Sequence, residues 1–141
     1  MPTAQVLVID DDDDTLEVVR DMLRGLGHIV RTARSAIDGV ISMSPTAPNV
    51  VLLDLSMPGI SGLDALPHFR HHYPHVPIIV VTSVLEADTL QRARDEGAFD
   101  ILSKPFVASE VAEMIDRAMR RGGSRCHATP RPPPPDAPDR R

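Results

Sequence analysis

The feature that most constrains the fold is an alternation between short apolar runs and longer segments with helical spacing. The runs are rich in β-branched residues, as buried strands are, and cover residues 5–9, 28–32, 50–53, 76–81 and 99–102. Between them, apolar residues recur every three or four positions. This predicts a first helix that Asp14 caps and that ends before Gly27, then helices over 36–43, 62–73, 87–96 and 109–121. Runs that are apolar on both faces indicate a parallel sheet covered on both sides, so we expect an α/β protein of five βα units.

Composition divides the chain into two parts. A length of 141 residues suits one ordinary domain. Residues 122–141 contain six of the 14 prolines and little that could be buried. Such a segment cannot offset the entropy that it would lose on ordering. We therefore predict a folded domain over residues 1–121 and a disordered Pro/Arg-rich tail over 122–141.

Charge and cysteine content limit the binding partners and the cellular compartment that we expect. The formal net charge is −5, which disfavours direct binding of nucleic acid. The single cysteine, Cys126, argues against a disulfide framework and fits a reducing compartment. The sequence has no apolar run of membrane-spanning length. We expect a cytoplasmic protein with no membrane contact.

Polar residues stand at the ends of four predicted strands. In a parallel sheet, the carboxyl ends of the strands meet at one edge, where ligands bind. The first strand ends at Asp10 and Asp11, the third at Asp54, the fourth at Thr82 and the fifth at Lys104, the sole lysine. Neighbouring carboxylates repel one another unless a cation bridges them or they bind protons. Mg²⁺, with its preference for oxygen ligands, suits such a site and would also accept phosphate oxygens.

The five consecutive aspartates, residues 10–14, need more than one explanation. We assign Asp10 and Asp11 to the metal. Asp14 can cap the following helix, and Asp12 and Asp13 add negative charge at its positive end. For Asp12 and Asp13, a solvated acidic loop is the simpler interpretation.

Four motifs occur in order over roughly residues 4–121, namely VIDDD, LLDLSMPGISG, VVTS and EGAFDILSKPF. With them the sequence resembles a response-regulator receiver domain, the phosphoacceptor of two-component signalling. The resemblance implies a flavodoxin-like, doubly wound fold. It also implies a switch that takes a phosphoryl group from a histidine kinase or histidine phosphotransfer protein onto Asp54 and then changes its binding to a downstream protein. Such a domain is no enzyme beyond catalysing its own phosphorylation and slow dephosphorylation, and homodimerisation stays open.

The resemblance also implies roles for single residues. Asp10, Asp11, Asp54 and the backbone carbonyl of Ser56 would bind Mg²⁺. Lys104 and the Thr82 hydroxyl would contact the phosphoryl group, and the peptide bond before Pro105 would be cis. In one respect the chain departs from the family, because Ile101 stands where an aromatic residue usually reports phosphorylation.

Two alternatives remain from the sequence. The pattern Asp11-x-Asp13-x-Thr15 is similar to the first motif of haloacid-dehalogenase-like phosphatases, with Asp11 as nucleophile, but it leaves LLDLSMPG and LSKPF unexplained. The other alternative is a pseudo-receiver scaffold that is never phosphorylated; the complete set of strand-end residues speaks against it.

A group of histidines lies outside this pattern. His68 and His72 are four residues apart on one predicted helix, a spacing known from metal sites, and His71 and His75 are close by. Prolines flank the group, and no cysteine or carboxylate completes a ligand set. A solvated helix end is therefore favoured over a zinc site.

Overall fold

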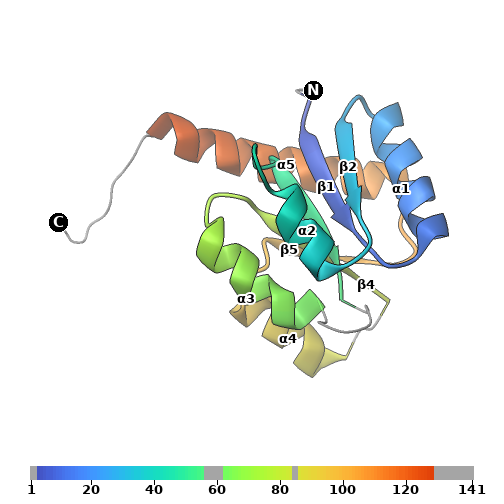
Figure 1. Cartoon of the computed structure of the whole chain (residues 1–141), viewed down its shortest axis with the longest axis vertical. Helices are drawn as coiled ribbons and strands as arrows, with labels where there is room; N and C mark the ends of the chain where they lie inside the picture. Colours follow the sequence, from blue (N-terminus) through green and yellow to red (C-terminus); the bar gives the residue numbers. More distant parts are fainter. Residues whose placement is uncertain (1–2, 56–61, 84–85, 129–141) are drawn as a thin grey trace.

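The chain folds around one parallel β-sheet, shown in Figure 1. The computed structural model describes residues 3–55, 62–83 and 86–128. The strand order is β2-β1-β3-β4-β5. The strands are β1 (Gln5–Ile9), β2 (Ile29–Ala33), β3 (Val50–Asp54), β4 (Ile78–Thr82) and β5 (Asp100–Ser103). All residues of β3 and β4 are buried, because helices cover the central strands on both faces, whereas the edge strands β2 and β5 are partly exposed.

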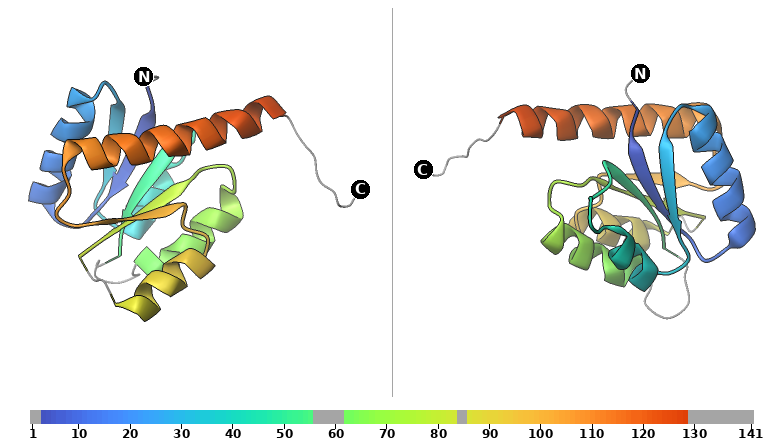
Figure 2. Two further views of the ribbon diagram at one scale, coloured as in Figure 1. Left: turned by 180° about the vertical axis from the view of Figure 1, so that it is seen from behind. Right: turned by 45° about the horizontal axis from the view of Figure 1, so that its top comes forward.

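Five helices follow the five strands. They are α1 (Asp13–Gly25), α2 (Ala36–Ser42), α3 (Gly62–His72), α4 (Ala87–Asp95) and α5 (Ala108–Ala128). The buried residues form two clusters, one on each face of the sheet. Residues of α1 and α5 belong to one cluster and residues of α2, α3 and α4 to the other, an arrangement that both views of Figure 2 show. The predicted flavodoxin-like, doubly wound fold is confirmed.

The register of the strands brings their carboxyl ends together. Ile9 of β1 pairs with Leu53 of β3, so that the next residues in the chain, Asp10 and Asp54, lie side by side at the edge of the sheet. Asp54 in turn pairs with Val81 of β4. Thr82 pairs with Ser103 of β5, which places Lys104 just beyond the same edge.

Glycines follow two of the helices, and the sequence predicts this for Gly27. Gly27 follows α1 with φ of 93°, and Gly97 follows α4 with φ of 100°, a region that glycine adopts without strain. The backbone N–H groups of Gly27 and His28 donate to the carbonyls of Arg24 and Leu23, which satisfies the open end of α1.

Most boundaries lie within one residue of the prediction, and three differ by more. The N-cap of α1 is Asp12 and not Asp14, which lies inside the first turn. Strand β4 starts two residues later than predicted, after Pro77, whose carbonyl still accepts the N–H of Val51. Helix α5 continues to Ala128 and so extends seven residues beyond its predicted end at residue 121. Elongating an existing helix costs little, and that is why the glycines at 122 and 123 do not end it. Residues 129–141 lie outside the described residues.

None of the helices in the described part of the chain combines the length and the apolar composition needed to cross a lipid bilayer.

Candidate functional site

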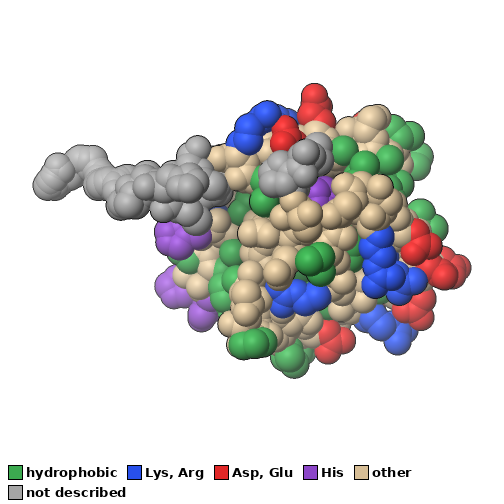
Figure 3. All heavy atoms as spheres, turned by 90° about the horizontal axis from the view of Figure 1, so that it is seen from above, with side chains coloured by type: hydrophobic (Ala, Val, Ile, Leu, Met, Phe, Trp, Pro, Cys, Tyr) green, Lys and Arg blue, Asp and Glu red, His purple; other side chains and the backbone are tan. Residues whose placement is uncertain are grey.

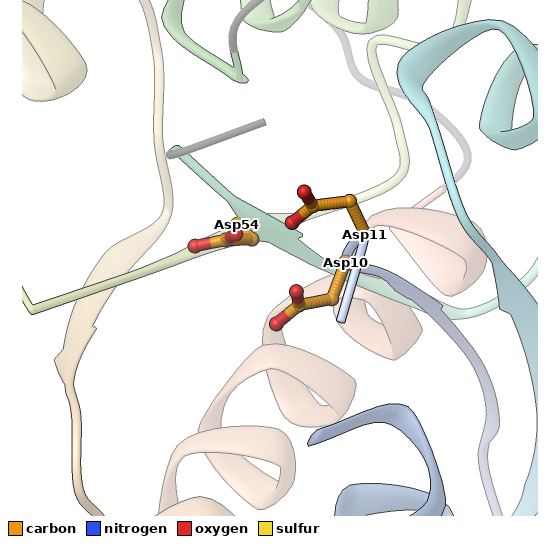
Figure 4. Close-up of side chains that lie close together, drawn as sticks. All are labelled: Asp10, Asp11 and Asp54. Atoms are coloured by element: carbon orange, nitrogen blue, oxygen red, sulfur yellow. The ribbon is translucent and has the colours of Figure 1, made fainter. Parts of the chain in front are cut away.

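Three carboxylates meet at the carboxyl edge of the sheet. Asp10 and Asp11 follow β1, and Asp54 is the last residue of β3 (Figure 4). One oxygen from each of them lies within 4.8 Å of the others. Asp10 and Asp54 are buried, whereas Asp11 is exposed. The parallel topology forces this approach, because the apolar residues that precede each aspartate are held in neighbouring strands.

Lys104 is the cation of this cluster. Its ammonium group donates to Asp10 Oδ2 at 3.0 Å and lies 3.4 Å from Asp54 Oδ1. Partial burial alone would lower the pKa of Lys104, but the hydrogen bond to Asp10 and the charge of Asp54 outweigh it, so the pKa is raised above its ordinary value. Lys104 is therefore held as a charged group between two carboxylates that come from two different strands.

The donor set fits a hard divalent cation. With the three carboxylates ionised, Lys104 offsets only one of three negative charges, and a dication would offset the other two. All the candidate side-chain ligands are carboxylate oxygens, which Mg²⁺ and Ca²⁺ prefer to softer ligands. Ser56, whose backbone carbonyl the resemblance adds to this set, lies outside the described residues.

The remaining aspartates of the block have other partners. The backbone N–H of Asp12 donates to Asp10 Oδ1 at 3.0 Å, which orients the Asp10 carboxylate. The Thr15 hydroxyl donates to Asp12 Oδ2 at 2.5 Å and holds the pKa of Asp12 below its ordinary value. Asp13 pairs with Arg34 at 2.9 Å. The block thus divides as the sequence suggested, with Asp10 and Asp11 in the cluster and the next two outside it.

Thr82 lies one strand away from the carboxylates. It is fully buried at the end of β4, and its carbonyl accepts the backbone N–H of Lys104 at 2.9 Å. Ser83, which follows it, is exposed. The structure therefore places Thr82 beside Lys104 through the backbone. The predicted cis bond between Lys104 and Pro105 is present, and Ile101 is half-buried on β5.

Gly62 is a residue that sequence reasoning missed. A Cβ atom at this position would lie 2.3 Å from the Asp54 carbonyl oxygen and 2.7 Å from the Leu55 Cα. Only glycine lets the first turn of α3 approach the end of β3 so closely. The sequence shows the glycine, but the approach depends on tertiary packing.

An open groove adjoins the cluster. It has a volume of about 500 Å³ and lies between α1 and the segment after β5. Its lining is mostly apolar, with Val18, Val19, Met22, Pro105 and Phe106, and it reaches Lys104 and Ser83. Val18 is 59% exposed, so an apolar surface lies open to solvent beside the charged site.

Comparisons with known proteins agree with this geometry. The family described as the response regulator receiver domain matches residues 6–116. The DNA-binding transcriptional regulator NtrC of Klebsiella pneumoniae is 33% identical over 112 residues, which are 79% of this chain and 24% of NtrC. The transcriptional regulatory protein PrrA of Mycobacterium tuberculosis is 32% identical over 120 residues, which are 85% of this chain and 52% of PrrA. The chain thus spans about a quarter to a half of the length of these regulators.

Solved structures give the same result. A response regulator receiver domain protein from Clostridium thermocellum superposes with a TM-score of 0.81 at 32% identity and covers 86% of this chain and 98% of its own. NtrX from Brucella abortus superposes with a TM-score of 0.85 at 28% identity, over 91% of this chain and 30% of NtrX. None of these matches supports the phosphatase or the pseudo-receiver alternative. The chain belongs to the response-regulator receiver domain family, the phosphorylation-controlled switches of two-component signalling.

Proposed function

We propose that Asp54 accepts a phosphoryl group from a phosphohistidine and that a Mg²⁺ ion is held beside it. The supporting observation is the position of Asp54: it is buried at a strand end, 3.4 Å from the Lys104 ammonium, with two further carboxylates within 4.8 Å. In the transfer, an Asp54 oxygen forms a bond to phosphorus while the bond from phosphorus to the donor's imidazole nitrogen breaks. The imidazole leaves with the electron pair of that bond.

The other residues of the site would neutralise the negative charge of the phosphoryl group and hold the metal ion. Asp10, Asp11, Asp54 and the Ser56 carbonyl would hold the Mg²⁺, which when bound neutralises phosphoryl oxygens. Lys104 would move from its contact with Asp54 to a phosphoryl oxygen, and the Thr82 hydroxyl would donate to another. Positioning and charge neutralisation of this kind are most of what phosphoryl transfer requires.

A mass measurement tests the acceptor. With Mg²⁺ and acetyl phosphate, the wild type should gain one phosphoryl group, and peptide mapping should place it on Asp54. The variant Asp54→Asn should gain none, whereas Asp100→Asn, which changes an aspartate on β5, should react like the wild type. A phosphoryl group on Asp11, or full labelling of Asp54→Asn, would contradict the assignment.

The partners would be a phosphohistidine protein and a downstream protein target in the cytoplasm. We place the contact of the donor at the apolar groove beside Lys104, since a donor seated there would face the acidic cluster. A charged residue in the groove should then slow transfer from a donor protein but not from acetyl phosphate. Val18→Lys tests this on α1, and Ile37→Lys, at a similarly exposed position on α2, is the matched control. Equal slowing by both variants would remove the groove from this role.

Ile101 limits how phosphorylation can be relayed. A half-buried isoleucine has neither a ring nor a hydroxyl group, so a relay based on an aromatic side chain at this position does not apply. Any change at β5 would instead proceed through the backbone bond between Lys104 and Thr82 and through packing.

A further inference from the structure

We propose that His68 and His72 form a binding site for a divalent late transition-metal ion such as Zn²⁺, separate from the acidic centre. Both residues lie on α3, which runs unbroken from Gly62 to His72 with Pro67 inside it. Both are exposed and can be reached by an ion from solvent. Histidine side chains gather along one edge of the surface in Figure 3.

The ring geometry shows that the two imidazoles are immediate neighbours on the helix surface. The imidazole rings of His68 and His72 have centroids 4.2 Å apart and are 30° from parallel. Two nitrogens on a tetrahedral Zn²⁺ lie about 3.3 Å apart, from the usual Zn–N distance of about 2.05 Å. The two stacked rings are close enough to share an ion, provided that they splay apart so that one nitrogen of each points to it. His71, in contrast, meets His72 edge-on, at 77°.

A hydrogen bond prepares His72 as a ligand. Its Nδ1 lies 3.1 Å from the backbone carbonyl of His68. A carbonyl oxygen can only accept, so Nδ1 carries the proton and the neutral ring presents the lone pair of Nε2. Metal-bound histidines commonly donate their second N–H to a backbone carbonyl in this way, which fixes the tautomer and the ring.

The surroundings define the kind of site. His72 is the last residue of α3, and a helix carboxyl end favours a cation. Asp64 is one turn before His68, but it pairs with Arg92 at 3.1 Å and is not a ready third ligand. The protein thus offers two imidazoles, and water or a side chain of a bound partner would complete the coordination. Imidazole ligands select Zn²⁺, Cu²⁺ or Ni²⁺ over Mg²⁺.

Zinc titration by calorimetry tests the pair. Excess Mg²⁺ is kept present, so that the acidic centre does not take up the Zn²⁺. The association constant should fall by about tenfold or more in His68→Ala and in His72→Gln. It should stay within about twofold of the wild type in His71→Ala, the matched control on the same helix, and in Asp11→Ala, which changes the acidic centre. Far-UV circular dichroism without metal checks that each variant is folded.

A second readout identifies the ligand atom. Nitrogen NMR of the histidine rings should show a Zn²⁺-induced shift at Nε2 of His72, with Nδ1 still protonated. Loss of affinity in His71→Ala equal to that in His68→Ala would overturn the pair, and so would Zn²⁺ binding that Asp11→Ala abolishes. Both outcomes are independent of whether Asp54 is phosphorylated.

Discussion

Replacing Asp54 by asparagine should stabilise the protein when divalent ions are removed. The three carboxylates have oxygens within 4.8 Å of one another. At an effective dielectric constant of about 20, two like charges at 4.8 Å repel by about 3.5 kcal/mol. The substitution removes two such repulsions and one attraction, that of Lys104 at 3.4 Å, worth about 5 kcal/mol on the same scale.

The net effect before solvent screening is therefore a gain of about 2 kcal/mol. Because Asp11 is exposed, solvent weakens its repulsion of Asp54, and the expected gain is about 1 kcal/mol. In a domain of this size, that corresponds to a rise in Tm of about 4 °C. The asparagine keeps one oxygen in place, so packing at the strand end is preserved.

Mg²⁺ should reduce or reverse the stability difference between Asp54→Asn and the wild type. An ion that binds only the folded protein stabilises it by about 1.4 kcal/mol at tenfold its Kd, and the wild type should gain more than Asp54→Asn. The assay is urea unfolding in chelator and in Mg²⁺. The control is Asp100→Asn, which removes a carboxylate paired with Arg117 at 3.1 Å and should lose up to about 1 kcal/mol in both buffers. If Asp54→Asn is less stable than the wild type in chelator, the charge argument fails.

Three further perturbations test the packing and the charges. Lys104→Met removes the cation that offsets the cluster, so it should lower stability in chelator and enlarge the gain on adding Mg²⁺, both measured as Tm; an unchanged Tm in chelator would contradict this. Gly62→Ala should lower the free energy of unfolding by about 1–3 kcal/mol, because its Cβ meets rigid backbone. Gly25→Ala in α1 is the control, since its Cβ meets nothing within 4 Å and the change should be neutral or stabilising. Equal effects of the two variants in urea unfolding would refute the close approach at Gly62. Burial lowers the pKa of His28, so its contribution to stability is present above about pH 6.5 and is lost as the pH falls. His28→Gln should therefore lose less unfolding free energy between pH 7 and pH 5 than the wild type does, and an equal loss would remove His28 from this role.

The sheet and the acidic edge were predictable from the sequence for one physical reason. Parallel strands buried on both faces must be apolar throughout, so the first polar residue after each run marks where the strand leaves the core. That rule places Asp10 and Asp54 at one edge, and Lys104, which follows β5 directly, lies within hydrogen-bonding or ion-pair distance of both. It places Thr82 only at the end of a strand, and the direction of its hydroxyl does not follow from the pattern.

What could not be predicted depends on choices among near-equivalent residues. Any of three aspartates could cap α1, and the choice falls on Asp12, whose carboxylate Thr15 engages from the first turn. The spacing of His68 and His72 was visible, but the stacking of their rings and the carbonyl that fixes one tautomer were not. The end of α5 was misjudged because composition describes whether a helix can start better than whether an existing one can continue.

The contact between Lys104 and Asp10 has a consequence for how the chain can fold while it is being synthesised. The two residues are 94 positions apart in the chain. A ribosome that has released β1 and β3 has already delivered all three carboxylates, but the ammonium group that offsets them emerges about 50 residues later, after roughly 3–10 s of synthesis at about 5–20 residues per second. During that interval the half-made sheet carries uncompensated negative charge. A fragment ending before β5 should accordingly depend on divalent ions or high salt to become compact, to a degree that the complete chain does not.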